Sequence, residues 1–159
     1  MKIIAIDPGY GRIGIAVLEK NNNKEELIFS ECFVTDTTKT INERIFSAGK
    51  RIEELILFYK PEVLVIEALF FSKNTKTALF VAESRGVIIF QALNHNIPVY
   101  EYTPNQIKTA VAGHGNANKN DVFKMVERLV FLDKRKRIDD EIDAIAIGLT
   151  FFASYRKLP

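Results

Sequence analysis

Two short runs of branched aliphatic residues, each ending in an acid, constrain the fold of this chain most strongly. Residues 2–7 read KIIAID and residues 63–67 read VLVIE. Such continuous apolar runs are typical of strands that are buried on both faces of a sheet. Between them, the T-x-x-E pattern of residues 40–43 and a helical spacing of apolar residues predict an amphipathic helix that ends near Lys60, before Pro61. A strand, a helix and a second buried strand together indicate a parallel crossover.

The remaining segments complete a single α/β domain. Residues 13–18 and 27–35 predict two strands that form an antiparallel meander with the first, and residues 97–100 predict a fifth strand. Further helices are expected over residues 75–94, 104 to about 112, 119–132, and from Asp139 or Asp140 to Ala153. We therefore expect one domain over residues 1–159, with a five-stranded mixed sheet and helices on both of its faces.

The charge balance and the cysteine content exclude several classes of protein. The chain has 22 Lys and Arg against 20 Asp and Glu, a formal charge of +2, so any basic surface must be local. Its one cysteine, Cys32, excludes an internal disulfide and a multi-cysteine zinc site, and fits a reducing compartment. The sequence has neither a signal-peptide core nor an uncharged stretch long enough to span a membrane. We expect a soluble, cytoplasmic protein with no membrane association.

Four acidic side chains stand where a sheet of this kind places its functional site. Asp7 and Glu67 each end a strand, and in open α/β sheets sites lie outside the carboxyl ends of the strands. Asp140 and Asp143 are three residues apart, so they share one face of the last helix. Taken singly, each acid has an ordinary explanation as a turn residue, a solvated strand end or a helix cap. Asp143, however, precedes an apolar run with no Lys or Arg in the next ten residues, so a metal ion is its natural counter-charge.

The chemistry of these acids indicates what they would do together. Carboxylates without His or Cys companions favour hard divalent ions, Mg²⁺ or Mn²⁺, because these ions prefer oxygen ligands. Two such ions about 4 Å apart can activate water on one side of a phosphodiester and stabilise the leaving oxygen on the other. If the four acids converge, the sequence predicts phosphodiester hydrolysis with two ions per active site.

Three segments that contain these acids resemble a known family. Asp7-Pro8-Gly9, Val65-Ile66-Glu67 and Asp140-x-x-Asp143-Ala144 are similar to the three acidic motifs of the RuvC family of Holliday junction resolvases, which share the ribonuclease H-like fold. The likeness covers nearly the whole chain and includes Phe70, Lys73-Asn74, Ser84-Arg85-Gly86, Thr103-Pro104, Gln106-Ile107-Lys108 and the segment from Gly113 to Lys119.

The resemblance implies a homodimeric, Mg²⁺-dependent endonuclease that nicks two opposed strands of a four-way DNA junction in recombination and DNA repair. It assigns the two ions to Asp7, Glu67, Asp140 and Asp143. It also implies the branch-migration proteins RuvA and RuvB as partners. The helix over residues 75–94 is apolar around much of its girth, so we expect it to form the dimer seam, with core burial as the competing explanation.

Residues outside the acidic group are expected to contact DNA. By resemblance, Phe70 stacks on an unpaired base, and Lys108 and Lys119 bind phosphate. On general grounds any one surface lysine is more often simply solvated. The basic run at residues 134–137 is more often a solvated loop, although it precedes the last helix and could contact junction arms. Arg85 has three open explanations: a structural contact, a dimer contact or a DNA contact.

Other functions are compatible with parts of this pattern. A YqgF-like ribonuclease H-fold nuclease that acts on RNA resembles the chain in its first motif. A junction-binding module without catalysis would not require the four acids. An actin-like ATPase would need a second repeated half, which 159 residues do not provide. Within the acidic cluster at the last helix, Asp140 is the partner of Asp143 by spacing, which leaves Asp139 as the expected helix cap.

Overall fold

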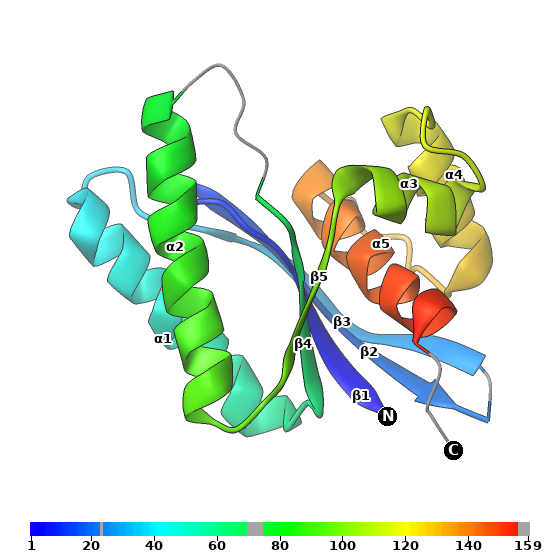
Figure 1. Ribbon diagram of the computed structural model, residues 1–159, viewed down its shortest axis with the longest axis horizontal. Coiled ribbons are helices and arrows are strands. Elements are labelled where there is room, and N and C mark those ends of the chain that lie inside the picture. Colours follow the sequence, from blue (N-terminus) through cyan, green and yellow to red (C-terminus); the bar gives the residue numbers. More distant parts are fainter. Residues whose placement is uncertain (23, 70–74, 156–159) are drawn as a thin grey trace.

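The computed structural model describes residues 1–22, 24–69 and 75–155, and within these ranges the chain forms a five-stranded mixed sheet with helices on both faces (Figure 1). The elements are β1 (Lys2–Asp7), β2 (Arg12–Asn21), β3 (Lys24–Val34), α1 (Ile41–Tyr59), β4 (Val63–Glu67), α2 (Thr75–Asn94), β5 (Val99–Tyr102), α3 (Pro104–Ala112), α4 (Lys119–Leu129) and α5 (Asp139–Ser154). The predicted fold class is confirmed.

The first strand occupies the centre of the sheet. The strand order is β3-β2-β1-β4-β5, with β1 antiparallel to β2 and parallel to β4. Residues 3–6 of β1 are fully buried, as expected for a strand that is covered on both faces. Because β1 and β4 run in the same direction in register, with Ile6 beside Ile66, their carboxyl ends reach the same edge of the sheet.

Two separate cores lie on the two faces of the sheet. Figure 1 shows α1 and α2 packed over one face, and α5 over the other with α3 and α4 beside it. Alternate residues of β1 serve the two cores: Ile3 packs under α5, while Ile4 packs under α1 and α2. Helix α5 approaches the sheet closely at Gly148, where a Cβ atom would come within 2.5 Å of Leu18 Cδ1. The buried helix α5 thereby holds a fixed position above β1 and β2.

Several element boundaries differ from the sequence expectations. The fifth strand begins at Val99 rather than at residue 97, because Ile97 still donates its N–H to the carbonyl of Ala92 at the end of α2. Helix α4 ends at Leu129 rather than at residue 132. The expectation that Asp139 caps α5 is wrong: Ile138 holds the N-cap position, and its side chain cannot accept a hydrogen bond. In the described part of the chain, no helix has the length and apolarity needed to cross a membrane.

Candidate active site

Two of the predicted acids lie side by side at one edge of the sheet. Asp7 is the last residue of β1 and Glu67 is the last residue of β4, the parallel neighbour of β1. Their carboxyl groups are close enough that the charge of Glu67 raises the pKa of Asp7, after the larger effect of burial. In Figure 1 this edge is the upper end of the sheet, between α2 and the start of α5.

A glycine brings the other two acids to the same edge. Gly14 of β2 pairs with Asp7 across the antiparallel ladder. A Cβ atom on Gly14 would lie 1.9 Å from the backbone oxygen of Asp140 and 3.1 Å from Asp7 Cβ. The first turn of α5 therefore rests on the space that a side chain would fill, with Asp140 beside Asp7. Asp143 follows three residues later on the same helix face.

The convergence of these carboxyl groups shifts their protonation. Burial, followed by repulsion from Glu67, Asp143 and Asp140, raises the pKa of Asp7 to about 8. Burial is also the main cause that raises the pKa of Glu67 and that of Asp143. Lys119 and Lys108 oppose the shift at Asp143 by lowering its pKa. The four acids form an electrostatically strained cluster to which a cation would bind favourably.

Two basic side chains approach the acidic cluster from different elements. Arg12 Nε, at the start of β2, lies 3.5 Å from Asp140 Oδ2. Lys119 Nζ, at the start of α4, lies 3.9 Å from Asp143 Oδ2 and 3.6 Å from Asp139 Oδ2. The sequence argument named a metal ion as a natural counter-charge for Asp143, and the fold also brings in a lysine 24 positions away in sequence. Lys119 is 76% exposed, so this contact compensates the charge only weakly.

The donor set suits a hard divalent cation. The four acids supply only oxygen atoms, and Asp140 Oδ2 is buried without a hydrogen-bond partner among the residues that the structure describes. Such an orphaned anionic oxygen is costly unless a cation or a water contacts it. In the described ranges, no group of three or more His, Cys, Asp or Glu side chains is arranged tightly enough to enclose an ion in its present geometry. The chemistry of the residues fits a metal, although their side chains are not set in a closed coordination shell.

A cavity of about 370 Å³ opens beside these acids. Its lining includes Glu67 and Asp143 together with residues of α3 and of the start of α4, among them Lys108, Asn118 and Lys119. Asn118 caps α4, so the N–H groups of the first turn of α4 point toward this side. The structure thus places two of the three predicted DNA-contacting residues next to the acids. Phe70, the third, lies outside the described residues.

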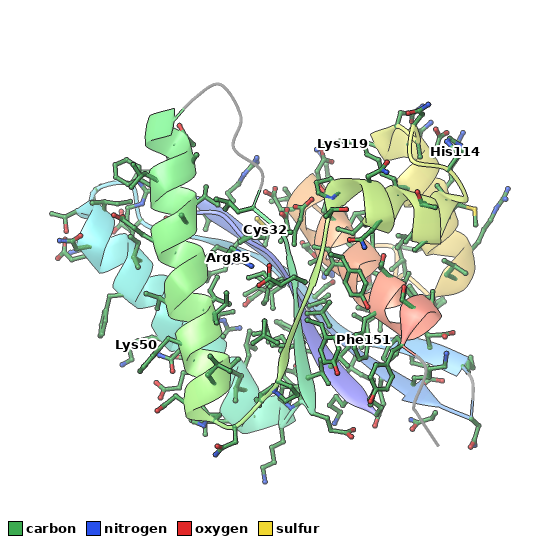
Figure 2. All side chains as sticks on the ribbon, viewed as in Figure 1. Cys32, Lys50, Arg85, His114, Lys119 and Phe151 are labelled. Atoms are coloured by element: carbon green, nitrogen blue, oxygen red, sulfur yellow. The ribbon has the colours of Figure 1, made fainter. Side chains whose placement is uncertain are left out.

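Neither His114 nor Arg137 lines this cavity. Figure 2 shows His114 near Lys119, on the α3–α4 side of the molecule. Arg137 is 7% exposed and bonds to Asp133, so at least this member of the basic run is not a solvated loop residue. Arg12 was not predicted to be part of the site. Its position five residues after Asp7 was the only available signal, since the contact with Asp140 depends on the fold.

Comparison with known proteins agrees with this geometry. The model of the family described as Crossover junction endodeoxyribonuclease RuvC matches residues 3–151. The chain belongs to the RuvC family. Among the RuvC relatives, that of Thermosipho melanesiensis is 44% identical over 93% of this chain and 94% of its own length, and that of Caldanaerobacter subterraneus subsp. tengcongensis is 40% identical over 94% and 90%.

Solved structures support the same assignment. RuvC of T. thermophilus in complex with a Holliday junction substrate superimposes with a TM-score of 0.89 at 33% identity, over 96% of this chain and 93% of the other. The yeast mitochondrial Holliday junction resolvase Ydc2 matches with a TM-score of 0.70 at 14% identity, over 95% and 77%, which shows a shared fold. The sequence resemblance to RuvC and the nuclease class that it implies are confirmed.

Proposed function

We propose that this protein resolves four-way DNA junctions by hydrolysing one phosphodiester bond in each of two opposed strands, in recombination and DNA repair. The observation that carries the proposal is the convergence of Asp7, Glu67, Asp140 and Asp143, from three distant segments, at one sheet edge in a chain of the RuvC family. Support for the substrate comes from the RuvC of T. thermophilus, whose solved structure holds a Holliday junction.

The four acids are proposed to hold two Mg²⁺ ions, which Mn²⁺ could replace. Bound there, such ions supply an activated water and stabilise the leaving oxygen of the phosphodiester. The protein's own contribution is to keep the acids close together at a cost in repulsion, as the raised pKa of Asp7 indicates. Binding of a cation then relieves that repulsion, so the cluster is prepared for metal before DNA arrives.

The walls of the cavity are proposed to hold the DNA backbone. Lys108 and Lys119 line the same cavity as Glu67 and Asp143, and the N–H groups at the start of α4 add donors for a phosphate oxygen. A phosphodiester held on this side would lie between its positive contacts and the acids. Phe70 is proposed to stack on an unpaired base, as in the family pattern.

A homodimer would place one such site on each of two equivalent strands. We propose residues 1–159 as one catalytic domain whose α1–α2 face forms the dimer seam. A groove of about 580 Å³ lies between these helices, and Phe46 of α1 and Phe90 of α2 are more than half exposed. Two copies related by a twofold axis match the approximate symmetry of an open four-way junction. RuvA and RuvB are the proposed branch-migration partners.

One assay tests the proposal against its alternatives. The purified protein is incubated with Mg²⁺ and a synthetic mobile four-way junction, with a linear DNA duplex and a branched RNA of the same arm length as controls. Paired symmetric nicks in the DNA junction, and intact linear duplex, are expected. Preferential cutting of the RNA would favour the YqgF-like function, and junction binding without cutting would favour a non-catalytic module. EDTA should abolish the nicks.

A further inference from the structure

Two consecutive side chains of α2 contact the backbone at both strand ends that carry the proposed acids. Ser84 Oγ donates to the carbonyl oxygen of Gly9 at 2.8 Å, two residues after Asp7. Arg85 Nε donates to the carbonyl oxygen of Glu67 itself at 3.3 Å. One turn of a helix on the opposite face from α5 thus holds the ends of β1 and β4 at once.

Both contacts are sheltered from water. Ser84 is fully buried, and the side chain of Arg85 is 16% exposed and points from α2 toward the sheet (Figure 2). Breaking a hydrogen bond at such a position leaves a buried donor or acceptor unpaired, which disfavours small displacements of either strand end. The two bonds therefore restrict where the backbones of Asp7 and Glu67 can lie.

Arg85 is itself fixed by a second contact. Its Nη2 lies 2.6 Å from Glu101 Oε2 on β5, the strand next to β4. Directly after Glu67, the N–H of Ala68 donates to the carbonyl of Tyr102 on the same strand β5. The planar guanidinium, with its fixed set of donors, thus joins α2, the end of β4 and β5 into one rigid corner.

We propose that Ser84 and Arg85 are positioning residues that set the spacing of Asp7 and Glu67 through the backbones that carry them. The inference rests on the proposed function for its catalytic consequence. Catalytic groups must be held within about 0.5 Å of their productive geometry, and a displacement of about 1 Å can cost about 100-fold in rate. Neither side chain contacts the reacting atoms in this account, since both act on the main chain behind the acids.

Matched controls distinguish positioning from general stabilisation. Ser47 on α1 donates to the carbonyl of Arg44 at 2.7 Å, and Arg51 on α1 forms ion pairs with Glu31 and Glu54, away from the acids. The variants S84A and R85M are therefore compared with S47A and R51M. R85K, which keeps the cation but not the planar fork, is the conservative variant of the series.

The test measures single-turnover junction cleavage, its dependence on Mg²⁺ concentration, and junction affinity in EDTA. We expect R85M to cleave about 100-fold and S84A about 3- to 10-fold more slowly per folded molecule, with half-maximal rates at higher Mg²⁺ and unchanged affinity in EDTA. R85K should recover part of the rate. S47A and R51M should stay within about twofold of the unaltered protein. Normal rates and normal Mg²⁺ dependence for folded R85M, R85K and S84A would overturn the proposal.

A second readout needs no activity. In metal-free protein, hydrogen exchange of the Ala68 amide should be faster in R85M and R85K than in R51M, because its bond to Tyr102 lies in the corner that Arg85 holds. Equal exchange in all variants would overturn the positioning role even if the unaltered protein cleaves junctions. Conversely, the Ala68 amide could exchange faster in R85M and R85K while the unaltered protein does not cleave junctions. That result would support the positioning role and contradict the proposed function.

Discussion

Asp140 and Glu141 are neighbours in the first turn of α5, yet their carboxylates differ in the number of hydrogen-bond and charge partners that surround them. Glu141 Oε2 accepts hydrogen bonds from Ser30 Oγ at 3.0 Å and from Arg135 Nη2 at 2.7 Å, and Arg137 Nε lies 3.9 Å away. Asp140 Oδ2 is buried with no hydrogen bond from the described residues. Arg12 Nε lies 3.5 Å from this oxygen, but its side chain is 59% exposed, so Asp140 is compensated much more weakly than Glu141 and can still bind a cation.

The contrast separates a structural acid from a functional one. The Glu141 network anchors the segment that precedes α5 to β3, because Arg135 also donates to the backbone oxygen of Ser30. The acids at the sheet edge are instead crowded together, and burial, followed by repulsion from the neighbouring acids, raises the pKa of Asp7. Breaking the buried Glu141 pair would leave a charge unpaired inside the fold, whereas the crowded and weakly compensated acids at the edge cost stability and are typical of a functional site.

Removal of the weakly compensated carboxylate of Asp140 should produce the largest effect. D140N is expected to lower junction cleavage by about 10²–10³-fold, the range found when one preorganised electrostatic contact is lost. Its free energy of unfolding should change little or rise, because the exposed contact with Arg12 contributes little and a partly buried charge disappears. Single-turnover cleavage and denaturant unfolding measure the two quantities. Cleavage within tenfold of normal would remove Asp140 from the site.

The neighbouring substitution should reverse this pattern. E141Q is expected to lower the free energy of unfolding by about 2–3 kcal/mol, below the full value for a broken buried pair because Arg135 is 42% exposed. Cleavage per folded molecule should fall far less than in D140N. Guanidinium unfolding at neutral pH, followed by cleavage assays well below the melting temperature, measures both. If E141Q is as stable as the unaltered protein, Glu141 is not a structural acid, and the proposed contrast with Asp140 is wrong.

The sequence predicted those features of the site that depend on short local patterns. Apolar runs ending in acids located Asp7 and Glu67, and an i, i+3 spacing located Asp140 and Asp143. Both signals depend on a few consecutive residues and on the periods of strands and helices. The convergence of Asp7 and Glu67 followed from the parallel order of β1 and β4, whereas the approach of Asp140 and Asp143 depends on the packing of α5 against Gly14.

The contacts that the sequence did not predict join distant segments. Glu141 follows two other acids at the start of α5, and its partner on the sheet is Ser30, 111 residues away. Lys119 reaches Asp143 only because α4 folds back beside α5. Such partners depend on how distant segments pack together, and the spacing of residues within one segment does not predict this. The same holds for the hydrogen bonds from Ser84 and Arg85 of α2 to the ends of β1 and β4.

The strained cluster also predicts an unusual pH dependence for the metal-free protein. Because folding raises the pKa of Asp7 from 3.8 to about 8, its contribution to stability is present below pH 4 and is lost as the pH rises toward 8. D7N removes this dependence. We expect D7N to be more stable than the unaltered protein at pH 8 by about 1–2 kcal/mol, and similar to it near pH 4.

Urea unfolding in EDTA across this pH range measures the difference, and added Mg²⁺ provides the control. Mg²⁺ should stabilise the unaltered protein at pH 8 by binding the folded state, and it should stabilise D7N much less. The opposite result would be a gain in stability of the unaltered protein from pH 4 to pH 8 relative to D7N. It would mean that the folded protein does not raise the pKa of Asp7, and it would contradict the contrast with Glu141.

The smallest predicted effect concerns Lys119, which weakly compensates the charge of Asp143 at the edge of the sheet. Lys119 is exposed and lies 3.9 Å from Asp143, so its main use is proposed to be a DNA phosphate rather than the acid. K119M should weaken junction binding in EDTA by a few-fold and reduce the salt slope of log K by about one. K124M, at an exposed position on the same helix, is the matched control and should leave the slope unchanged. If the salt slope of log K is unchanged in K119M, Lys119 does not bind a DNA phosphate. It would then serve as a structural counter-charge for the acids at the edge of the sheet, as Arg135 does for Glu141.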